Sequence, residues 1–441
     1  MSVDSFVNNF KNTFETAQKA LNGSATLYPN VVRTSAYESF LNTGIPTTKN
    51  EEWKYVNLFP FFSKDFQFSN SQEISKEFAT YIKDSIETIN PEFALVVVNG
   101  KILPQLSKNL DSYEGKILGL DQFYSENPEE FTSSFQTLHS TPNSIFEHVA
   151  TALSFDGFVV QFDKKVVIYK PLFILNFIDT SAQHTVIPTR YVVKAEKFSQ
   201  ASIVEQTFTF GTNTSLSIAT SELFVDEQAN ISIVKLQNDK KESIVLDSMS
   251  VAQKSSSTVT ATTISYGSSL IRNNHRAVHN GSNIHTNMFG LALAQDKQLI
   301  DNHTEIDHAT AHCSSTESYK HILSDSSTVV FNGKVFVREQ AQKTNAYQSN
   351  KTILLSDTAT INSKPQLEIF ADDVKCSHGA TCGGIDEDAI FYLRSRGIST
   401  KDAMSMLTFA FAEDIVMNIE NESVRSRIEE DIKNLLSNRT K

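Results

Sequence analysis

The 441 residues are 40% apolar and 20% charged, which is enough material for two or three domains with buried cores. A net charge of −12, with no cluster of lysine and arginine, argues against nucleic acid or an anionic membrane as a partner. No apolar run reaches the ~20 residues of a membrane helix, no secretory signal begins the sequence, and three scattered cysteines form no disulfide framework. We therefore expect a cytoplasmic protein.

Residues 1–150 are predicted to form a mainly helical domain with one small hairpin. The stretches FVNNFKNTFETAQKAL and AYESFLNT repeat apolar residues every three to four positions, and Gly44 and Pro46 end the second one. The loop GIPTTKNEEWKY follows and carries the only tryptophan, Trp53, which we interpret as a core anchor. EFALVVVNGKIL is typical of a hairpin that turns at Asn99-Gly100.

Residues 151–372 are predicted to form a parallel β-helix. Short β-branched runs such as KVVIYKPLFILNFI, ASIVEQTFTF, NISIVKLQN and STVVFNGKVFV are typical of strands. Polar turns recur near Ser199, Glu227, Lys254 and Gly281, at intervals of 28, 27 and 27 residues. Strands with a repeat of this length indicate a solenoid.

Proline placement supports the same fold. Residues 189–364 contain no proline, and proline is confined to sheet edges because it donates no ladder hydrogen bond. Almost every strand of a parallel β-helix is paired on both sides. A β-sandwich is the alternative, but its edge strands and loops would accommodate some prolines.

Residues 373–441 are predicted to form a C-terminal helical domain. In DEDAIFYLRSRG, Asp386 is a suitable N-cap and Gly397 a suitable left-handed stop. Ser399 and Asp402 have capping-box spacing ahead of a second helix. An apolar stripe on that helix comprises Met404, Leu407, Phe411, Ile415 and Ile419.

Chemical motifs are few. The sequence has no GxxxxGK[ST], GxGxxG, GxSxG or CxxC motif, so we expect no nucleotide hydrolysis by this chain alone. Eight of the eleven histidines lie between 275 and 378. Within one strand His308 and His312 would stand about 13 Å apart, too far to share a metal. Histidines of neighbouring coils could converge, although hydrogen-bonding histidines are the commoner outcome.

Cys376, His378 and Cys382 lie within seven positions of one another. If the chain is extended, Cys376 and His378 share a face at a separation of about 6 to 7 Å. A structural zinc site needs four ligands, normally as two close pairs, and the second pair is absent. The residues alone leave three interpretations open, namely a metal site completed elsewhere, a redox pair, or a buried thiol beside a histidine bonded to backbone.

The stretch ADDVKCSHGATCGGIDEDAIFYLRSRGIS, residues 371–399, resembles the C-terminal signature of the SufB/SufD family of the SUF iron–sulfur cluster assembly system. DNHTEIDH with CSSTESYK, and GIPTTKNEEWKY, resemble two further stretches of the family. SufB-like sequences carry a histidine-glutamate pair where this chain has Cys376-Ser377-His378, which is the form of the SufD branch. Cys382 departs from the valine common in the family, so the resemblance assigns it no role and we expect it to pack.

The resemblance implies a right-handed parallel β-helix flanked by N-terminal and C-terminal helical domains. It also implies a non-catalytic scaffold subunit that pairs with a SufB-like paralogue and binds a SufC-like ATPase through its C-terminal helices. A homodimer is expected when the chain is alone. The residues expected to bind the ATPase are Phe391, Arg394, Arg396, Met404, Leu407 and Phe411.

In the family, the nascent cluster is built at the interface between the paralogues. By resemblance, His378 is the candidate metal ligand and Cys376 assists it, whereas no cofactor is bound permanently and iron or a cluster is shared transiently with the partner. The alternative functions are a β-helix carbohydrate-active enzyme, which needs paired carboxylates on one face, and a zinc-dependent enzyme, which needs three close ligands. The sequence shows neither set.

Overall fold

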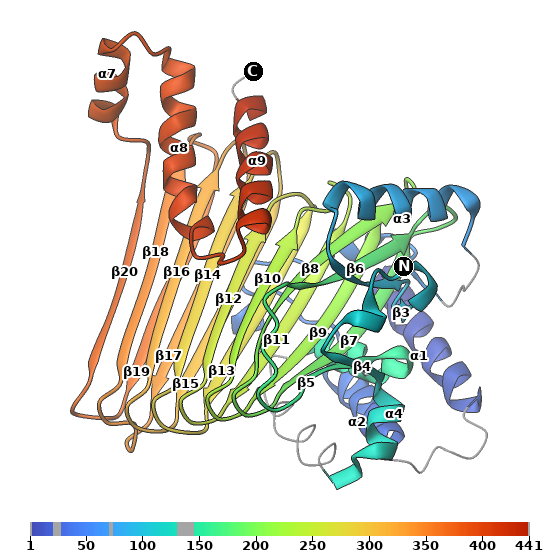
Figure 1. Ribbon diagram of the computed structural model, residues 1–441. Coiled ribbons are helices and arrows are strands. Elements are labelled where there is room, and N and C mark those ends of the chain that lie inside the picture. Colours follow the sequence, from blue (N-terminus) through green and yellow to red (C-terminus); the bar gives the residue numbers. More distant parts are fainter. Residues whose placement is uncertain (1, 21–27, 70–73, 130–144, 440–441) are drawn as a thin grey trace.

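The chain forms a long, flattened solenoid with helices at both ends (Figure 1). The computed structural model describes residues 2–20, 28–69, 74–129 and 145–439, to which the structural statements below refer. Its helices are α1 (Ser2–Ala20), α2 (Tyr28–Thr43), α3 (Lys76–Ile89), α4 (Leu120–Glu126), α6 (Ile145–Ala152), α7 (Glu387–Ser395), α8 (Thr400–Val416) and α9 (Glu422–Arg439).

Two ten-stranded sheets make up the solenoid. Sheet A runs in the spatial order β19 (Thr360–Ile369), β17 (Thr328–Val337), β15 (Leu299–His308), β13 (Leu270–His279), β11 (Ile244–Gln253), β9 (Ser215–Val225), β7 (Thr185–Ala195), β5 (Phe158–Phe162) and β4 (Lys116–Gly119), with β1 (Gln67–Phe68) paired to β7. Sheet B runs in the order β20 (Lys375–Gly383), β18 (Asn345–Leu354), β16 (Ser314–Leu323), β14 (His285–Ala294), β12 (Thr258–Ser265), β10 (Asn230–Gln237), β8 (Gln200–Phe210), β6 (Leu172–Asp179), β2 (Phe93–Val98) and β3 (Lys101–Ile102). From β5 onward the chain alternates between the two sheets.

The coil length agrees with the repeat seen in the sequence. Asn230 pairs with Thr258, Thr258 with His285, and His285 with Ser314, so successive coils advance by 28, 27 and 29 residues. All these ladders are parallel. The predicted parallel β-helix is therefore confirmed, and the β-sandwich alternative is not the fold.

Identical register between coils stacks the inward side chains into columns. One column of sheet A comprises Leu223, Val251, Ala277, Ile306 and Val335. All five side chains are completely buried, and burying each larger one stabilises the fold by roughly 1.5 to 3 kcal/mol. Inward apolar columns thus explain why the sequence reads as short runs rich in valine and isoleucine.

The proline that ends the long proline-free span occupies a sheet edge. Pro365 lies in β19, the last strand of sheet A. The amide of Thr360 donates to Ser327, just before β17, and that of Phe370 donates to Val337, the last residue of β17. In a strand, alternate residues point their backbone groups to opposite sides. Residue 365 therefore faces the free edge, where a missing N–H costs nothing.

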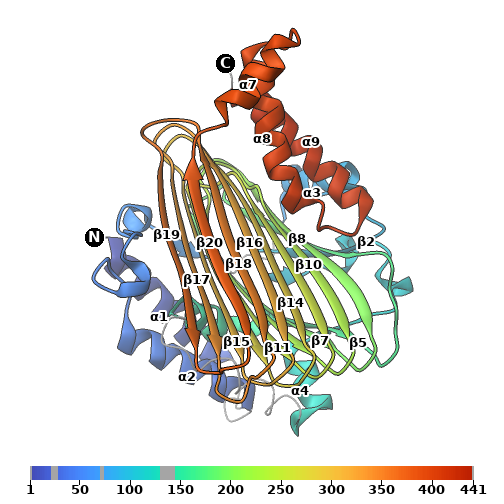
Figure 2. The ribbon, with the colours of Figure 1, turned by 90° about the vertical axis from the view of Figure 1, so that its left-hand side faces the viewer.

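Helices cover the outer faces of both sheets (Figure 2). Phe10 of α1, Phe40 of α2 and Trp53 pack in one apolar cluster with outward residues of sheet A such as Leu216 and Leu246. Trp53 is 2% exposed, which confirms it as a core anchor. On sheet B, α3, α8 and α9 pack over a second apolar cluster. The hairpin at Asn99-Gly100 is present, and its first strand, β2, also extends sheet B through β6.

The C-terminal helices begin and end at the residues that the sequence indicates. Asp386 caps α7 by accepting from the amides of Asp388 and Ala389. Gly397 ends that helix with a φ of 86°, and Ser399 caps α8 by accepting from the Asp402 amide. Within the described residues no helix has both the length and the apolar character to cross a membrane.

Candidate functional site

The site lies at the end of the solenoid formed by β19 and β20, which faces the viewer in Figure 2. Among the described strands, β20 pairs only with β18, so its other edge is free. The Lys375 amide donates to Thr344 beside β18. By alternation, the amides of Cys376, His378, Ala380 and Cys382 point to the free edge.

Cys376, His378 and Cys382 share the inner face of β20. Their register partners on β18 are Ala346, Gln348 and Thr352, all buried. The Gln348 side chain reaches Gly333 on the opposite sheet, and parallel partners in register point to the same side. The three predicted residues therefore lie on the inner face of the last coil, at the uncovered end of the solenoid formed by β19 and β20, which is called the mouth below. Cys382 is about 13 Å along the strand from His378.

Exposure separates Cys376 from His378. The imidazole of His378 is exposed, as is the Cys382 side chain, whereas Cys376 is half-buried against an apolar cluster that includes Val335 and Ala346. Burial raises the pKa of the Cys376 thiol. The thiol is therefore held in its protonated, poorly nucleophilic form, and the accessible ligand at the mouth is His378.

The residues predicted to bind an ATPase fall into two groups. Phe391 and Arg394 are exposed on α7, and Arg396 is exposed at its C-cap; this helix stands away from the sheets in Figure 1. Met404 and Leu407 of α8 are half-buried. Phe411 is half-buried against sheet B, where the Lys320 Nζ lies 4.5 Å from the centre of its ring. Phe411 thus joins α8 to the solenoid.

The same helices expose two apolar residues that the sequence prediction missed. Tyr392 is 57% exposed on α7 and Met406 is 51% exposed on α8. Phe391, beside Tyr392, is 72% exposed. Exposed large apolar side chains are typical of a protein contact surface, and the exposed Phe391 and Tyr392 of α7 and Met406 of α8 are together called the helical docking surface below.

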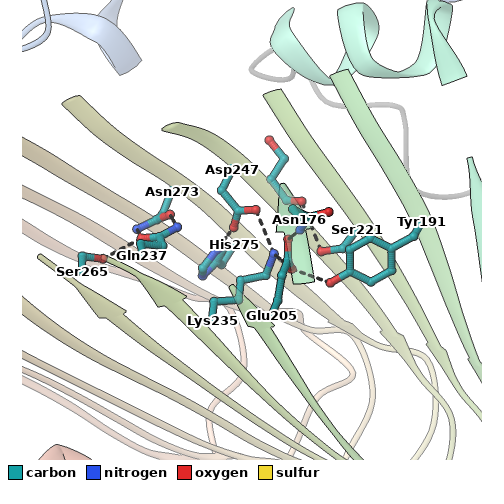
Figure 3. Close-up of polar contacts among 11 residues, drawn as sticks. Asn176, Tyr191, Glu205, Ser221, Lys235, Gln237, Asp247, Ser265, Asn273 and His275 are labelled. Atoms are coloured by element: carbon teal, nitrogen blue, oxygen red, sulfur yellow. Dashed lines mark hydrogen bonds and ion pairs between the residues drawn. The ribbon is translucent and has the colours of Figure 1, made fainter. Parts of the chain in front are cut away.

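The interior of the solenoid contains charged residues, which the sequence did not indicate. Figure 3 shows Lys235 between Glu205 and Asp247. Its Nζ lies 2.9 Å from Glu205 Oε2 and 2.8 Å from Asp247 Oδ1. The Tyr191 hydroxyl donates to Glu205 over 2.6 Å, and His275 Nε2 lies 2.9 Å from Asp247 Oδ2. These side chains form one buried hydrogen-bonded network.

The network keeps its ionised groups charged despite burial. Burial alone would lower the pKa of Lys235, but Asp247 and Glu205 hold it well above its ordinary value. Burial would likewise raise the pKa of Asp247, but Lys235 and His275 lower it to about 2. The charges therefore compensate one another inside the fold, and none of these ionised side chains is buried without a partner of opposite charge.

The solenoid histidines bond to neighbouring side chains. His279 and His308, in adjacent coils, converge with 3.2 Å between their Nδ1 atoms. Thr286 and Ser315 bond the outer nitrogens at 2.7 and 2.9 Å. Within the described part of the chain, no group of three or more histidine, cysteine, aspartate or glutamate residues could hold a metal ion.

Two stretches singled out in the sequence meet on the outer face of sheet A. His303 of DNHTEIDH lies 3.1 Å from Glu52 and 2.9 Å from Asp301. Arg272 pairs with Asp301 and stacks 3.8 Å over the ring of Trp53, the neighbour of Glu52. This cluster fastens the N-terminal loop to the solenoid.

Glu317 is a buried carboxyl close to the mouth. It is fully enclosed, and burial raises its pKa from 4.5 to about 7, partly offset by the hydrogen bond from Gln348. Because the folded pKa exceeds the unfolded one, stability falls as pH rises from 4.5 to 7. Above pH 7 the free energy of unfolding is therefore lower by about 3 kcal/mol in total than it is below pH 4.5.

We therefore expect Glu317→Gln to raise the free energy of unfolding at pH 8 by up to about 3 kcal/mol and to change it little at pH 5. Urea unfolding at both pH values measures this difference. Glu430→Gln, which changes an exposed glutamate of α9, serves as the control and should have no effect at either pH. An equal gain in the free energy of unfolding at pH 5 and pH 8 would show that ionisation of Glu317 does not destabilise the folded protein.

Comparison with known proteins gives a consistent result. A family model described as "SUF system FeS cluster assembly, SufBD core domain" matches residues 177–411, and another described as "SufBD protein N-terminal region" matches residues 5–174. The iron-sulfur cluster assembly protein SufD of Escherichia coli is 28% identical over 395 residues, 89% of either chain. An iron-sulfur cluster assembly SufBD family protein of Synechocystis is 27% identical over 394 residues, 87% of this chain and 86% of its own. A chloroplastic protein of Arabidopsis thaliana is 26% identical over 424 residues, 92% and 86% of the two chains.

Proposed function

We propose, since this chain belongs to the SufB/SufD family of the SUF iron–sulfur cluster assembly system, that it is a non-catalytic scaffold subunit. It pairs with a SufB-like paralogue at the open end of its solenoid and binds a SufC-like ATPase through the helical docking surface. The nascent cluster is the cargo and is built where the two solenoids meet. The unpaired cysteines are consistent with work in a reducing cytoplasm.

The observation that carries this proposal is the exposed His378 at an incomplete ligand site. His378 faces the mouth with one half-buried thiol, Cys376, beside it. Four ligands are needed to enclose a tetrahedral metal, so a facing subunit has to supply the others. Neutral imidazole binds iron, and a site with fewer thiolates than a resident cluster favours release of the finished cargo.

The two free edges at this end differ in their capacity to accept a strand. On β19 the edge-facing position 365 is a proline, which donates no hydrogen bond and protects an edge from pairing. On β20 the edge-facing positions are free of proline. Pairing with the paralogue should therefore run along β20, and this places His378 at the interface.

Replacing Ala380 with proline tests this arrangement. Ala380→Pro removes one N–H at the free edge and leaves the ladder to β18 intact, because Ala380 points its amide away from β18. An interface acceptor left without a partner costs about 1 to 3 kcal/mol, so we expect pairing with the SufB-like paralogue to weaken roughly 10- to 100-fold.

Light scattering of the isolated chain and of the equimolar mixture measures this pairing. Ala380→Val is the matched control, since it adds volume and keeps the N–H, and it should pair like the wild type. The isolated wild-type chain should form a homodimer through the same edge, less stable than the heterodimer. A mixture that stays monomeric with wild-type protein, or pairs equally well with Ala380→Pro, contradicts strand addition along β20.

A further inference from the structure

Gln348 has an unusual position between the buried carboxyl and the mouth. It lies in β18, completely buried, and its Nε2 donates to Glu317 Oε2 over 2.7 Å. Its Oε1 is enclosed but has no hydrogen-bond partner among the described residues. On the other flank of Gln348, in register on the inner face, is His378. An enclosed amide oxygen without a partner calls for an explanation, because leaving one unpaired costs about 1 to 3 kcal/mol.

The surroundings of Gln348 are shaped to hold its amide. A Cβ atom added at Gly333 would lie 2.5 Å from Gln348 Nε2 and 2.7 Å from the ring of Phe331. Gly333 lies on the opposite sheet, in β17, at a φ that other residues also adopt. The absence of a side chain at this position therefore leaves the space that the Gln348 amide occupies.

Glu317 fixes which end of the amide faces which neighbour. An ionised carboxylate only accepts hydrogen bonds, so Nε2 of Gln348 must face Glu317. The remaining end, Oε1, is then presented as an acceptor away from Glu317. The flank left for it is the one that holds His378.

We propose, building on the function proposed above, that Gln348 is a positioning residue for His378. The exposed imidazole of His378 turns to donate one ring N–H to this unpartnered Oε1, which selects one tautomer and leaves the other ring nitrogen bare at the open end of the solenoid. Only a bare nitrogen can bind iron. Metal-binding histidines commonly donate their second N–H to such an acceptor, which orients the ring.

The tautomer of His378 can be measured in the free chain by the ring 15N shifts of histidine-labelled protein at about pH 8.5, where Glu317 is ionised. The His378 signals are those lost in His378→Ala. We expect one dominant tautomer in the wild type and a mixture in Gln348→Met, which keeps the volume and removes the acceptor. Glu317→Gln should also give a mixture, because an amide at 317 no longer fixes the direction of Gln348.

Asn350→Ala is the matched control. Asn350 is a buried inward amide of the same strand, but its register partner is Ala380 and its Nδ2 donates to Ser363. This variant should leave the His378 tautomer unchanged. A mixture in the wild type, or an unchanged tautomer in a folded Gln348→Met, overturns the proposal.

Cluster yield distinguishes this proposal from the proposed function. In the reconstituted complex, Gln348→Met should lower cluster yield about 10-fold, as loss of an outer-shell partner commonly does, with complex formation unchanged. If His378→Ala builds clusters normally while the tautomer results hold, the positioning stands and the role of His378 in assembly fails. If His378→Ala loses clusters and Gln348→Met does not, the positioning fails alone.

Discussion

The double substitution Phe391→Asp and Met406→Asp should abolish binding of the SufC-like ATPase. Both side chains belong to the helical docking surface and are 72% and 51% exposed, so replacing them leaves the core of the protein intact. Truncating one central interface anchor commonly costs 2 kcal/mol or more. Two anchors replaced by carboxylates, which also resist desolvation, should weaken binding more than ~100-fold.

Tyr169→Asp is the matched control for this experiment. Tyr169 is 82% exposed in the connection between β5 and β6, in a cleft beside the α8–α9 connection that contains no residue of the helical docking surface. Calorimetric titration of purified ATPase into each variant measures the binding, and thermal melts verify the fold. We expect the control to bind the ATPase normally. If the double variant bound the ATPase as tightly as the wild type does, this surface of α7 and α8 would not be part of the ATPase interface.

Point substitutions are preferable to deleting these helices. Ala412, Ile415 and Val416 of α8 are buried in the cluster that covers sheet B, and Lys320 Nζ donates to the Phe411 carbonyl over 2.8 Å. Removing the chain from Ser399 onward would expose this apolar face of the solenoid. A loss of ATPase binding in such a truncation would therefore not separate contact from misfolding.

The solenoid could be predicted from sequence because its signals are local and repeated. The spacing of polar turns from Ser199 onward reports the coil length directly, and helix caps such as Asp386 act on amides two or three residues away. Signals of this kind depend on near neighbours in the chain. They can be interpreted without knowing the tertiary contacts of the folded chain.

The interior network could not be predicted for the opposite reason. A lysine inside a β-branched run is usually exposed, yet Lys235 is 3% exposed. Its partners Glu205 and Asp247 lie 30 and 12 residues away in sequence. The available signal was that Glu205 and Lys235 occupy equivalent positions of successive coils, which the register now shows.

The sequence proposes residues for the candidate site, and the structure adds how they are arranged. The sequence grouped Cys376, His378 and Cys382 and could only suggest a shared face. That the face is inward, that the mouth is open, and that Gln348 lies behind His378 all follow from β20 being the last strand. Phe411 was missed as a packing residue because an amphipathic stripe does not say which face meets the solenoid.

His378 is the residue on which the proposed function depends most. His378→Ala removes the accessible imidazole at the mouth, and no other described histidine lies on β20. Because the side chain is exposed, its loss should leave the solenoid and the helical docking surface unaffected. Cys382→Val should behave like the wild type, and Cys376→Ser should have an intermediate effect, since a half-buried thiol can assist only from the side.

The most direct test is cluster formation by complexes reconstituted from this chain, a SufB-like paralogue and a SufC-like ATPase, followed by visible absorbance while gel filtration reports assembly. With His378→Ala we expect complexes of normal size and composition that form almost no cluster. Wild-type absorbance from the His378→Ala complex would show that the residues at the mouth have a purely structural role.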